Sequence, residues 1–252
     1  MADEAAAPAA AARQAERALA AMARPAGEFD ASRYFRGTPD LGFYNVRTAT
    51  IRAMARSIVH EHRGRWTVDE AMAFAGALVP NRYIDVKSVA IEVLARYRRE
   101  FAPRLLPAWK RWLAAGHASN WATTDAICGL LIGPLLLAHP RLAPQMRAWA
   151  RHRALWVRRA AAVALVPSAR RGRLLDLAYD VAASLHADRE DLIHKAVGWL
   201  LREAGKTDPV RLERYLLDHG PAIPRTTLRY AIERFPRPKR QALLAATRTR
   251  QA

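Results

Sequence analysis

Acidic residues are scarce in the middle of this 252-residue chain. Between Glu100 and Asp176 there is a single carboxylate, Asp125, among twelve lysines and arginines. Such a lone acid is either an accident of composition or the one negative charge that a basic surface needs. The whole chain carries a formal net charge of +18, far beyond what solubility requires. This excess indicates a polyanionic partner, either a nucleic acid or an anionic membrane surface.

Cysteine and long apolar runs are nearly absent as well. Cys128 is the only cysteine, which excludes an intrachain disulfide and a cysteine-based zinc cluster. Its neighbours are apolar, so we expect a buried, inert thiol. The longest apolar run, Ala126–Ala138, contains Pro134 and is too short to span a bilayer. The N-terminus lacks the basic region of a secretory signal, and we expect a cytoplasmic protein without membrane attachment.

Common metal and cofactor motifs are also missing. The sequence His60-Glu61-His62 does not have the H-E-x-x-H spacing that puts two histidine ligands on one helix face. The chain has no glycine-rich phosphate loop and no G-x-S-x-G elbow of the serine hydrolases. We therefore expect neither a metal nor a cofactor.

Apolar residues recur with helical spacing, and no alternating strand pattern is present. Helix starts are indicated by the capping-box spacing at Thr67, by Asn120 and Asp188 as N-caps, and by Asp208 directly before a proline. The chain is therefore predicted to be all-α. The expected helices cover about residues 9–24, 45–62, 67–79, 83–100, 103–115, 121–138, 142–150, 153–166, 171–186, 189–205, 209–218, 224–235 and 237–248.

Pairs of these helices recur about every 35–45 residues, which is the range of HEAT and armadillo repeats. No strict sequence repeat is visible, so an irregular bundle is the alternative. We expect a curved solenoid of antiparallel HEAT-like helical pairs whose concave basic face could hold a duplex. Residues 1–25 are expected to form an Ala-rich N-terminal helix, loosely attached and dispensable for chemistry. Residues 26–248 are expected to form a single domain.

The lone acid Asp125 follows Trp121 by four residues, which puts the two side chains on the same helix face. Each has an ordinary explanation. Tryptophans usually pack between helices, and an acid near a helix start is stabilised by the helix dipole. On a surface that binds a polyanion, however, an aromatic ring beside a single anion suggests chemistry on a nucleic acid in which positive charge develops.

Three blocks, in their order and spacing, carry a resemblance to a known family. They are Trp121-x-x-x-Asp125, Trp156-Val157-Arg158-Arg159-Ala160-Ala161, and D-L-I-H-K-A-V-G-W-L-L-R-E from Asp191 to Glu203. Together they resemble the DNA alkylation repair enzymes of the AlkD type, which are glycosylases built from HEAT-like repeats. The segments Gly205–Pro209 and Ile223–Glu233 look like the C-terminal part of the same family. The resemblance runs from about Tyr34 to Arg234.

This resemblance implies roles for single residues. The family's catalytic aspartate falls on Asp125 and its neighbouring tryptophan on Trp121. Its cleft arginine falls on Arg159 rather than Arg158, and its second cleft tryptophan on Trp199. Further residues are expected to bind DNA, namely Arg202, Arg158, Tyr34 (a further cleft aromatic), Lys195 and Arg225.

The function implied by the resemblance is that of a monofunctional DNA glycosylase. It would excise cationic N3- and N7-alkylated purines from double-stranded DNA without obligatory base flipping. We expect a monomer that is cytoplasmic and associated with the nucleoid through DNA. Two alternatives share the charge pattern. One is a non-catalytic HEAT-repeat module that binds damaged or branched DNA, and the other is a scaffold for acidic proteins.

Overall fold

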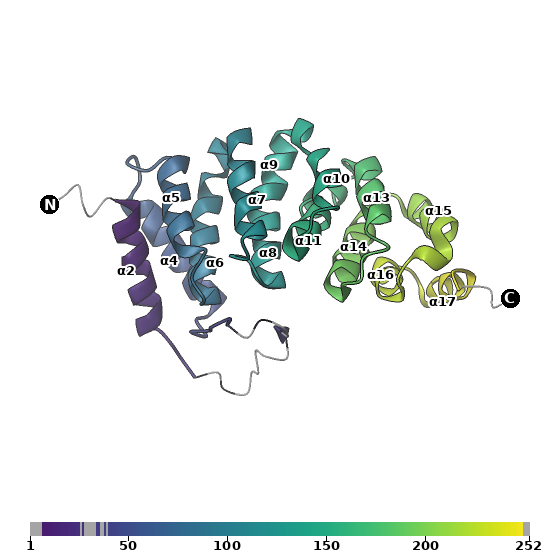
Figure 1. The fold of residues 1–252 in the computed structure, drawn as a ribbon, viewed down its shortest axis with the longest axis horizontal. Helices are drawn as coiled ribbons and strands as arrows, with labels where there is room; N and C mark the ends of the chain where they lie inside the picture. Colours follow the sequence, from purple (N-terminus) through teal and green to yellow (C-terminus); the bar gives the residue numbers. More distant parts are fainter. Residues whose placement is uncertain (1–6, 26, 28–33, 36–37, 39, 249–252) are drawn as a thin grey trace. The chain divides into compact units, whose positions relative to one another are not determined.

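The structure is a computed structural model that describes residues 7–25, 27, 34–35, 38 and 40–248. It is all-helical, as predicted from the sequence, and consistent with a helical solenoid (Figure 1). In this described part no strand is present, and Gly42 and Tyr83 form one isolated bridge. Two compact units divide the chain after Leu135. The expected curvature and the concave basic face stay predictions, as does the single domain over residues 26–248.

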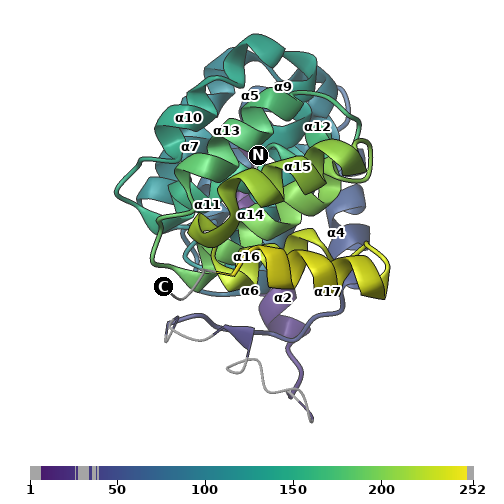
Figure 2. The same ribbon diagram turned by 90° about the vertical axis from the view of Figure 1, so that its right-hand side faces the viewer.

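The first unit contains the helices up to the start of α9. They are α2 (Pro8–Ala21), α4 (Thr48–Glu61), α5 (Val68–Leu78), α6 (Ile84–Leu94), the 3-10 helices η1 (Ala95–Glu100) and η2 (Pro103–Leu105), α7 (Leu106–Ala114), α8 (Trp121–Ile127), the π-helical turn η3 (Cys128–Ile132) and α9 (Gly133–Ala138). The second unit contains η4 (Pro140–Leu142), α10 (Gln145–Trp149), α11 (Leu155–Val163), α12 (Val166–Ala169), α13 (Leu175–Ser184), α14 (Asp191–Ala204), α15 (Pro209–His219), η5 (Gly220–Ala222), α16 (Arg225–Ala231) and α17 (Arg237–Ala246) (Figures 1 and 2).

Helix α6 is the centre of the first unit, because α4, α5 and α8 all pack on it. Its Val89, Ile91 and Leu94 are buried. Each such side chain stabilises the fold by about 1.5–3 kcal/mol. The expected Ala-rich N-terminal helix is α2, which packs against α5 and buries Leu19 fully. Whether α2 is dispensable for chemistry stays a prediction.

Helix α14 has the corresponding place in the second unit, where α11, α13 and α16 pack on it. The contact between α14 and α16 needs glycine at position 198. A Cβ there would lie 2.4 Å from Cβ of Tyr230 and 2.7 Å from the carbonyl oxygen of Thr227. Gly198 therefore sets the close approach of the two helices, and Trp199 follows it on α14.

Three of the four predicted helix starts are confirmed. Thr67 forms a capping box with Glu70, and the side chains of Asn120 and Asp208 accept backbone hydrogen bonds at the starts of α8 and α15. The prediction for Asp188 is wrong. Helix α14 begins after Glu190 without a side-chain cap, because the Asp188 carboxylate binds Arg158 and accepts the Glu190 N–H, which lies before the helix.

Helices α8, η3 and α9 form one helical run, Trp121–Ala138, that is longer than the apolar run seen in the sequence. By length and composition alone it could cross a membrane, and half of it is buried inside the protein. The π-helical turn has a local cause. Pro134 has no N–H to donate back to Leu130, and Gly133 N–H bonds to the Cys128 carbonyl instead.

Candidate functional site

The tryptophans fall into two groups by burial. Trp66, Trp109 and Trp149 are buried in the core. The others are half-buried, namely Trp112, Trp121, Trp156 and Trp199. The two tryptophans singled out by the sequence, Trp121 and Trp199, are therefore each partly exposed. Core packing alone does not account for them.

Trp121 is held in place by the segment that contains Tyr34 and Phe35. Its indole nitrogen donates to the Tyr34 carbonyl oxygen at 3.0 Å. The Phe35 ring stacks on the indole, with centroids 5.4 Å apart and planes inclined by 7°. Tyr34 as a whole is 60% exposed, and it contributes its backbone carbonyl to the anchor. Sequence reasoning missed Phe35, although it directly follows Tyr34.

The chain after Phe35 is in turn fixed to helix α6. The Phe43 ring lies 5.4 Å from the Phe35 ring. The buried carboxylate of Asp85 accepts the backbone N–H groups of Tyr44 at 2.8 Å and Val46 at 2.9 Å. The anchor of Trp121 is thus tied to the core of the first unit through hydrogen bonds to a buried acid.

Asp125 lies one turn after Trp121 on α8, on the same face, and is half-buried. The start of this helix is well defined. Asn120 accepts the Thr123 N–H at 2.8 Å and donates to the Thr123 hydroxyl at 2.9 Å. The hydroxyl of Thr124 donates to the Ala118 carbonyl at 2.9 Å. These bonds fix the first turn of α8 and with it the placement of Trp121 and Asp125.

A buried lysine holds the loop before α8. The Lys87 ammonium donates to the carbonyl oxygens of Val79 and His117, both at 2.7 Å. Only 4% of the residue is exposed. This burial lowers the pKa of Lys87 from 10.5 to about 8. Lys87 therefore joins the end of α5 to the loop between α7 and α8. No pattern in the sequence indicated this role.

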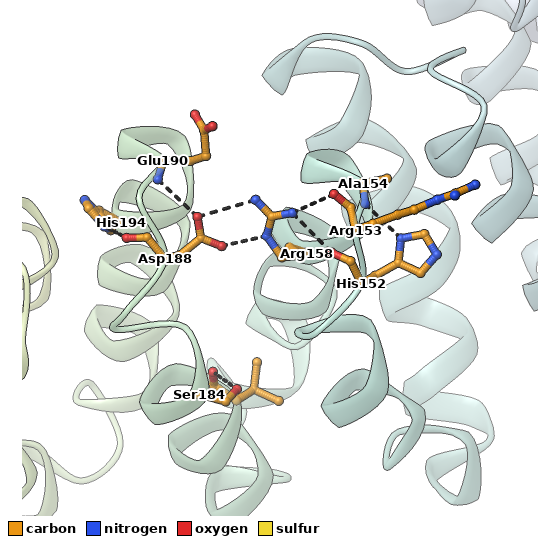
Figure 3. A network of polar contacts seen from close by, with 9 residues as sticks. His152, Arg153, Ala154, Arg158, Ser184, Asp188, Glu190 and His194 are labelled. Carbon is orange, nitrogen blue, oxygen red and sulfur yellow. Dashed lines mark hydrogen bonds and ion pairs between the residues drawn. The ribbon is translucent and has the colours of Figure 1, made fainter.

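In the second unit Arg158 has a structural role (Figure 3). Its Nε donates to Asp188 at 2.6 Å, and one terminal nitrogen donates to the carbonyls of His152 at 3.1 Å and Arg153 at 2.9 Å. Only 19% of the Arg158 side chain and 9% of the Asp188 side chain are exposed. The guanidinium thus joins the loop before α11 to the loop before α14, and these contacts compete with any contact to DNA.

Arg159 is buried, with 5% of the residue exposed. Its guanidinium donates to the Leu192 carbonyl in the first turn of α14. Arg158 and Arg159 therefore both reach the region where α14 begins, one through Asp188 and the other through the backbone. A phosphate could contact Arg159 only if this side chain moved outward.

The remaining predicted residues of α14 differ in how they are held. Trp199 is half-buried and follows the close-packed Gly198. Lys195 pairs with Asp191 at 2.7 Å, one turn earlier. Arg202 pairs with Glu233, and its Nε lies 3.6 Å from the buried Glu203 carboxylate. Lys195 is about two-fifths exposed and Arg202 about one-fifth.

Arg225 connects α16 to α17. It donates to the Thr247 hydroxyl at 3.1 Å and to the Leu244 carbonyl at 3.0 Å. Burial lowers the pKa of Arg225, and the nearby guanidinium groups of Arg248 and Arg229 lower it further. Arg225, Arg229 and Arg248 are therefore close enough to repel one another near the C-terminus.

The predicted site residues thus lie in both units. Trp121, Asp125 and Tyr34 belong to the first, and the others (Arg158, Arg159, Lys195, Trp199, Arg202 and Arg225) to the second. Within the first unit the structure brings Trp121 together with the segment at Tyr34. Over the described ranges, no group of three or more His, Cys, Asp or Glu side chains could hold a metal ion.

Comparison with known families adds to this geometry. The sequence model of one protein family, the DNA alkylation repair enzymes, matches residues 15–235, which is most of the chain. The chain belongs to this family. It therefore has a role in DNA repair, and its substrate is DNA. No curated protein matches it.

Among solved structures, the fold is similar to that of a predicted DNA alkylation repair enzyme from Enterococcus faecalis. The TM-score is 0.71 at 19% sequence identity, and the match covers 82% of this chain and 93% of the other. At this identity the likeness establishes the shared fold. It does not extend to the AlkD-type glycosylase activity that the sequence blocks imply.

Proposed function

We propose that this DNA alkylation repair protein is a monofunctional DNA glycosylase. It hydrolyses the N-glycosidic bond of cationic N3- and N7-alkylated purines in duplex DNA. The observation that carries the proposal is the pair of Trp121 and Asp125 on α8. An indole fixed by Phe35 lies one turn from a carboxylate, in a stretch of chain otherwise without acids. This is the combination that a developing cation at the sugar requires.

The chemistry fits a site without a strong general acid. When the bond between C1′ and the base nitrogen breaks, its electron pair goes to the base. A base alkylated at N3 or N7 carries a positive charge, so it leaves as a neutral molecule. The sugar becomes oxocarbenium-like, and a water molecule adds to C1′ and loses a proton. Asp125 stabilises the cation and receives this proton, which leaves an abasic site.

The tryptophans supply a second kind of stabilisation. A cation over an indole face gains about 0.5–2 kcal/mol. Because Phe35 covers one face of Trp121, the opposite face of this ring is the one that meets the sugar. We assign the same role to Trp199 in the second unit, where the half-buried ring follows Gly198.

Arg159 and Arg202 are the residues that we expect to grip phosphates of the lesion strand. A guanidinium binds a phosphate through two parallel hydrogen bonds, which fixes the position of the bound strand. In the free protein these groups bond to Leu192 and Glu233. DNA binding would therefore replace these contacts by contacts to phosphates, and the family resemblance implies that the base can stay stacked in the duplex.

A lyase would need an amine that attacks C1′, and Lys195 is the amine of the matched blocks. Its pairing with Asp191 supports a structural or phosphate-binding role instead. If wild-type protein cleaved abasic DNA and Lys195→Ala abolished this cleavage, the monofunctional assignment would be wrong.

The direct test is product analysis on methylated duplex DNA. We expect free 7-methylguanine and 3-methyladenine, and one abasic site for each base released. Strand breaks should form only after alkali or heat. Abasic sites without free bases, or direct strand cleavage, would contradict a monofunctional glycosylase.

A non-catalytic module that binds damaged or branched DNA is the second candidate. The engagement of Arg158 by Asp188 and the burial of Arg159 bear on this choice, because two arginines of the matched blocks then serve the fold rather than a catalytic cleft. Asp125→Asn separates the two functions. The glycosylase loses turnover and keeps its DNA affinity, whereas the binding module has no turnover to lose.

A further inference from the structure

Gly129 lies one turn after Asp125, on the side of the helix that faces solvent. Side chains on a helix lean back toward its N-terminus and cover the residue about one turn earlier. A side chain at position 129 would therefore lie over the Asp125 carboxylate. Glycine places no side chain there.

Packing does not explain this glycine. Over the residues that the structure describes, a Cβ at position 129 would meet no atom within 4 Å. At Gly198 and Gly205, by contrast, a Cβ would come within 2.4 Å of Tyr230 and 2.3 Å of Leu212. A glycine inside a helix lowers its stability relative to alanine, so position 129 carries a cost without a packing gain.

Backbone conformation does not explain it either. Gly129 is not among the glycines with positive φ, so an ordinary residue can adopt its backbone angles. The π-helical turn that contains it is accounted for by Pro134, which cannot donate to Leu130. The position could therefore hold alanine, lysine or leucine without strain.

Glycine at position 129 also prevents an ion pair with Asp125. A lysine or arginine four residues after an acid pairs with it on a helix, as Lys195 does with Asp191 at 2.7 Å. In a chain with 41 lysines and arginines, position 129 supplies no such cation to Asp125. Glycine at position 129 therefore places neither a cation nor any other side chain one turn after Asp125.

We propose that Gly129 is an access position for the substrate. Its missing side chain lets the deoxyribose of the lesion strand approach the Asp125 carboxylate, and it thereby sets how much of the sugar and its alkylated base the site accepts. This inference rests on the proposed glycosylase function. Gly129 acts through Asp125 and takes no part in the reaction itself.

The test compares Gly129→Lys, Gly129→Met and Gly129→Ala with matched changes at Gly76. Gly76 lies inside α5 and is equally open, since no described atom is within 4 Å of its Cβ position. For each variant we would measure three quantities. They are the melting temperature, the affinity for unmodified duplex DNA, and the single-turnover release of 7-methylguanine from methylated duplex DNA.

We expect Gly129→Ala and Gly76→Ala to melt about 2 °C higher than the wild type. Gly129→Lys and Gly129→Met should fold. Neither should bind unmodified DNA more weakly than the corresponding Gly76 variant, because lysine adds a positive charge and methionine adds none. Their single-turnover release should nevertheless fall about tenfold or more. A purely structural role of Gly129 would lower stability and binding together and would not produce this separation.

Release by Gly129→Lys and Gly129→Met at the wild-type rate would overturn the inference while leaving the proposed function intact. A lower melting temperature of Gly129→Ala would also overturn it, because the glycine would then serve the π-helical turn. A folded wild type that releases no base would overturn the proposed function, and the access role with it.

Discussion

The indole of Trp121 lies flat against the ring of Phe35, with centroids 5.4 Å apart and planes inclined by 7°. The indole N–H donates to the Tyr34 carbonyl at the same time. Stacking and a hydrogen bond together fix both the plane and the rotation of the ring. A tryptophan fixed in this way can offer one defined face to a cation without losing entropy when the substrate binds.

Phe35→Leu should therefore lower the rate of base release. Loss of the stacked ring removes about 0.5–1.5 kcal/mol of aromatic interaction and loosens Trp121, so we expect a rate about three- to tenfold lower. Tyr34→Ala keeps the backbone carbonyl that holds Trp121, so a loss in this variant reports the Tyr34 ring itself, which the family resemblance places at the DNA. An unchanged rate in Phe35→Leu would show that the stacked ring is not needed to position Trp121.

Replacing one partner of the Arg158–Asp188 pair should affect stability. Asp188→Asn leaves a largely buried guanidinium without its counter-charge, which we expect to cost about 2–3 kcal/mol of unfolding free energy. Urea unfolding measures this loss. An unchanged midpoint would contradict the structural role of Arg158.

The salt dependence of DNA binding separates Arg158 from Arg202. If about six phosphates are neutralised, a log–log plot of affinity against salt has a slope near −5. Arg202→Met should reduce the magnitude of the slope by about one, because it removes a phosphate contact. Arg158→Met should leave the slope unchanged. A reduced slope for Arg158→Met would assign this arginine to the DNA surface after all.

The second unit should lose stability in mild acid through His186. Burial, with smaller effects of His219 and His194, lowers the pKa of His186 from 6.5 to about 4, and its ring nitrogen bonds to the Tyr215 hydroxyl at 2.7 Å. Because the folded pKa lies below the unfolded one, the unfolded state takes up the proton first. Stability is complete above about pH 6.5 and falls toward pH 4.

The expected loss from His186 between pH 7 and pH 5 is about 2 kcal/mol. His186→Gln keeps a partner for the Tyr215 hydroxyl and does not titrate. The difference in unfolding free energy between pH 7 and pH 5 should therefore be about 2 kcal/mol smaller in this variant. Parallel pH profiles of wild type and variant would show that other groups govern the acid sensitivity.

Gly198→Ala should destabilise the contact between α14 and α16. The added Cβ would lie 2.7 Å from a backbone oxygen of Thr227, so the two helices must move apart. We expect a loss of about 1–3 kcal/mol, whereas Gly76→Ala in an open position should gain about 0.5–1 kcal/mol. Differential scanning calorimetry of both variants checks the contrast. An unchanged melting temperature of Gly198→Ala would mean that α14 and α16 can move apart without loss of stability.

Most helices were predictable from local signals. The apolar spacing and caps indicated 67–79 and 209–218, and the helices are Val68–Leu78 and Pro209–His219. Errors arose where local signals were weak. The expected helix 83–100 ends at Leu94 and continues as a 3-10 helix, because Tyr97 leaves the helical conformation.

The surroundings of the candidate site were less predictable. Sequence blocks singled out Trp121 and Asp125, yet the partner ring of Phe35 lies 86 positions earlier in the chain, and no local pattern connects them. Asp188 looked like a helix cap because its sequence distance from Arg158 hides their pairing. Contacts between distant segments depend on how the helices pack, and the local spacing of apolar residues in a single sequence does not reveal this packing.

The central claim is that Asp125 serves hydrolysis of the glycosidic bond, and one measurement tests it most directly. It is the single-turnover release of 7-methylguanine and 3-methyladenine from methylated duplex DNA by the wild type and by Asp125→Asn, at equal fractions of bound DNA. We predict release by the wild type and a rate at least about 100-fold lower in the variant, with unchanged or tighter DNA binding. Equal rates would contradict the account, and so would a folded, DNA-binding wild type that releases no base.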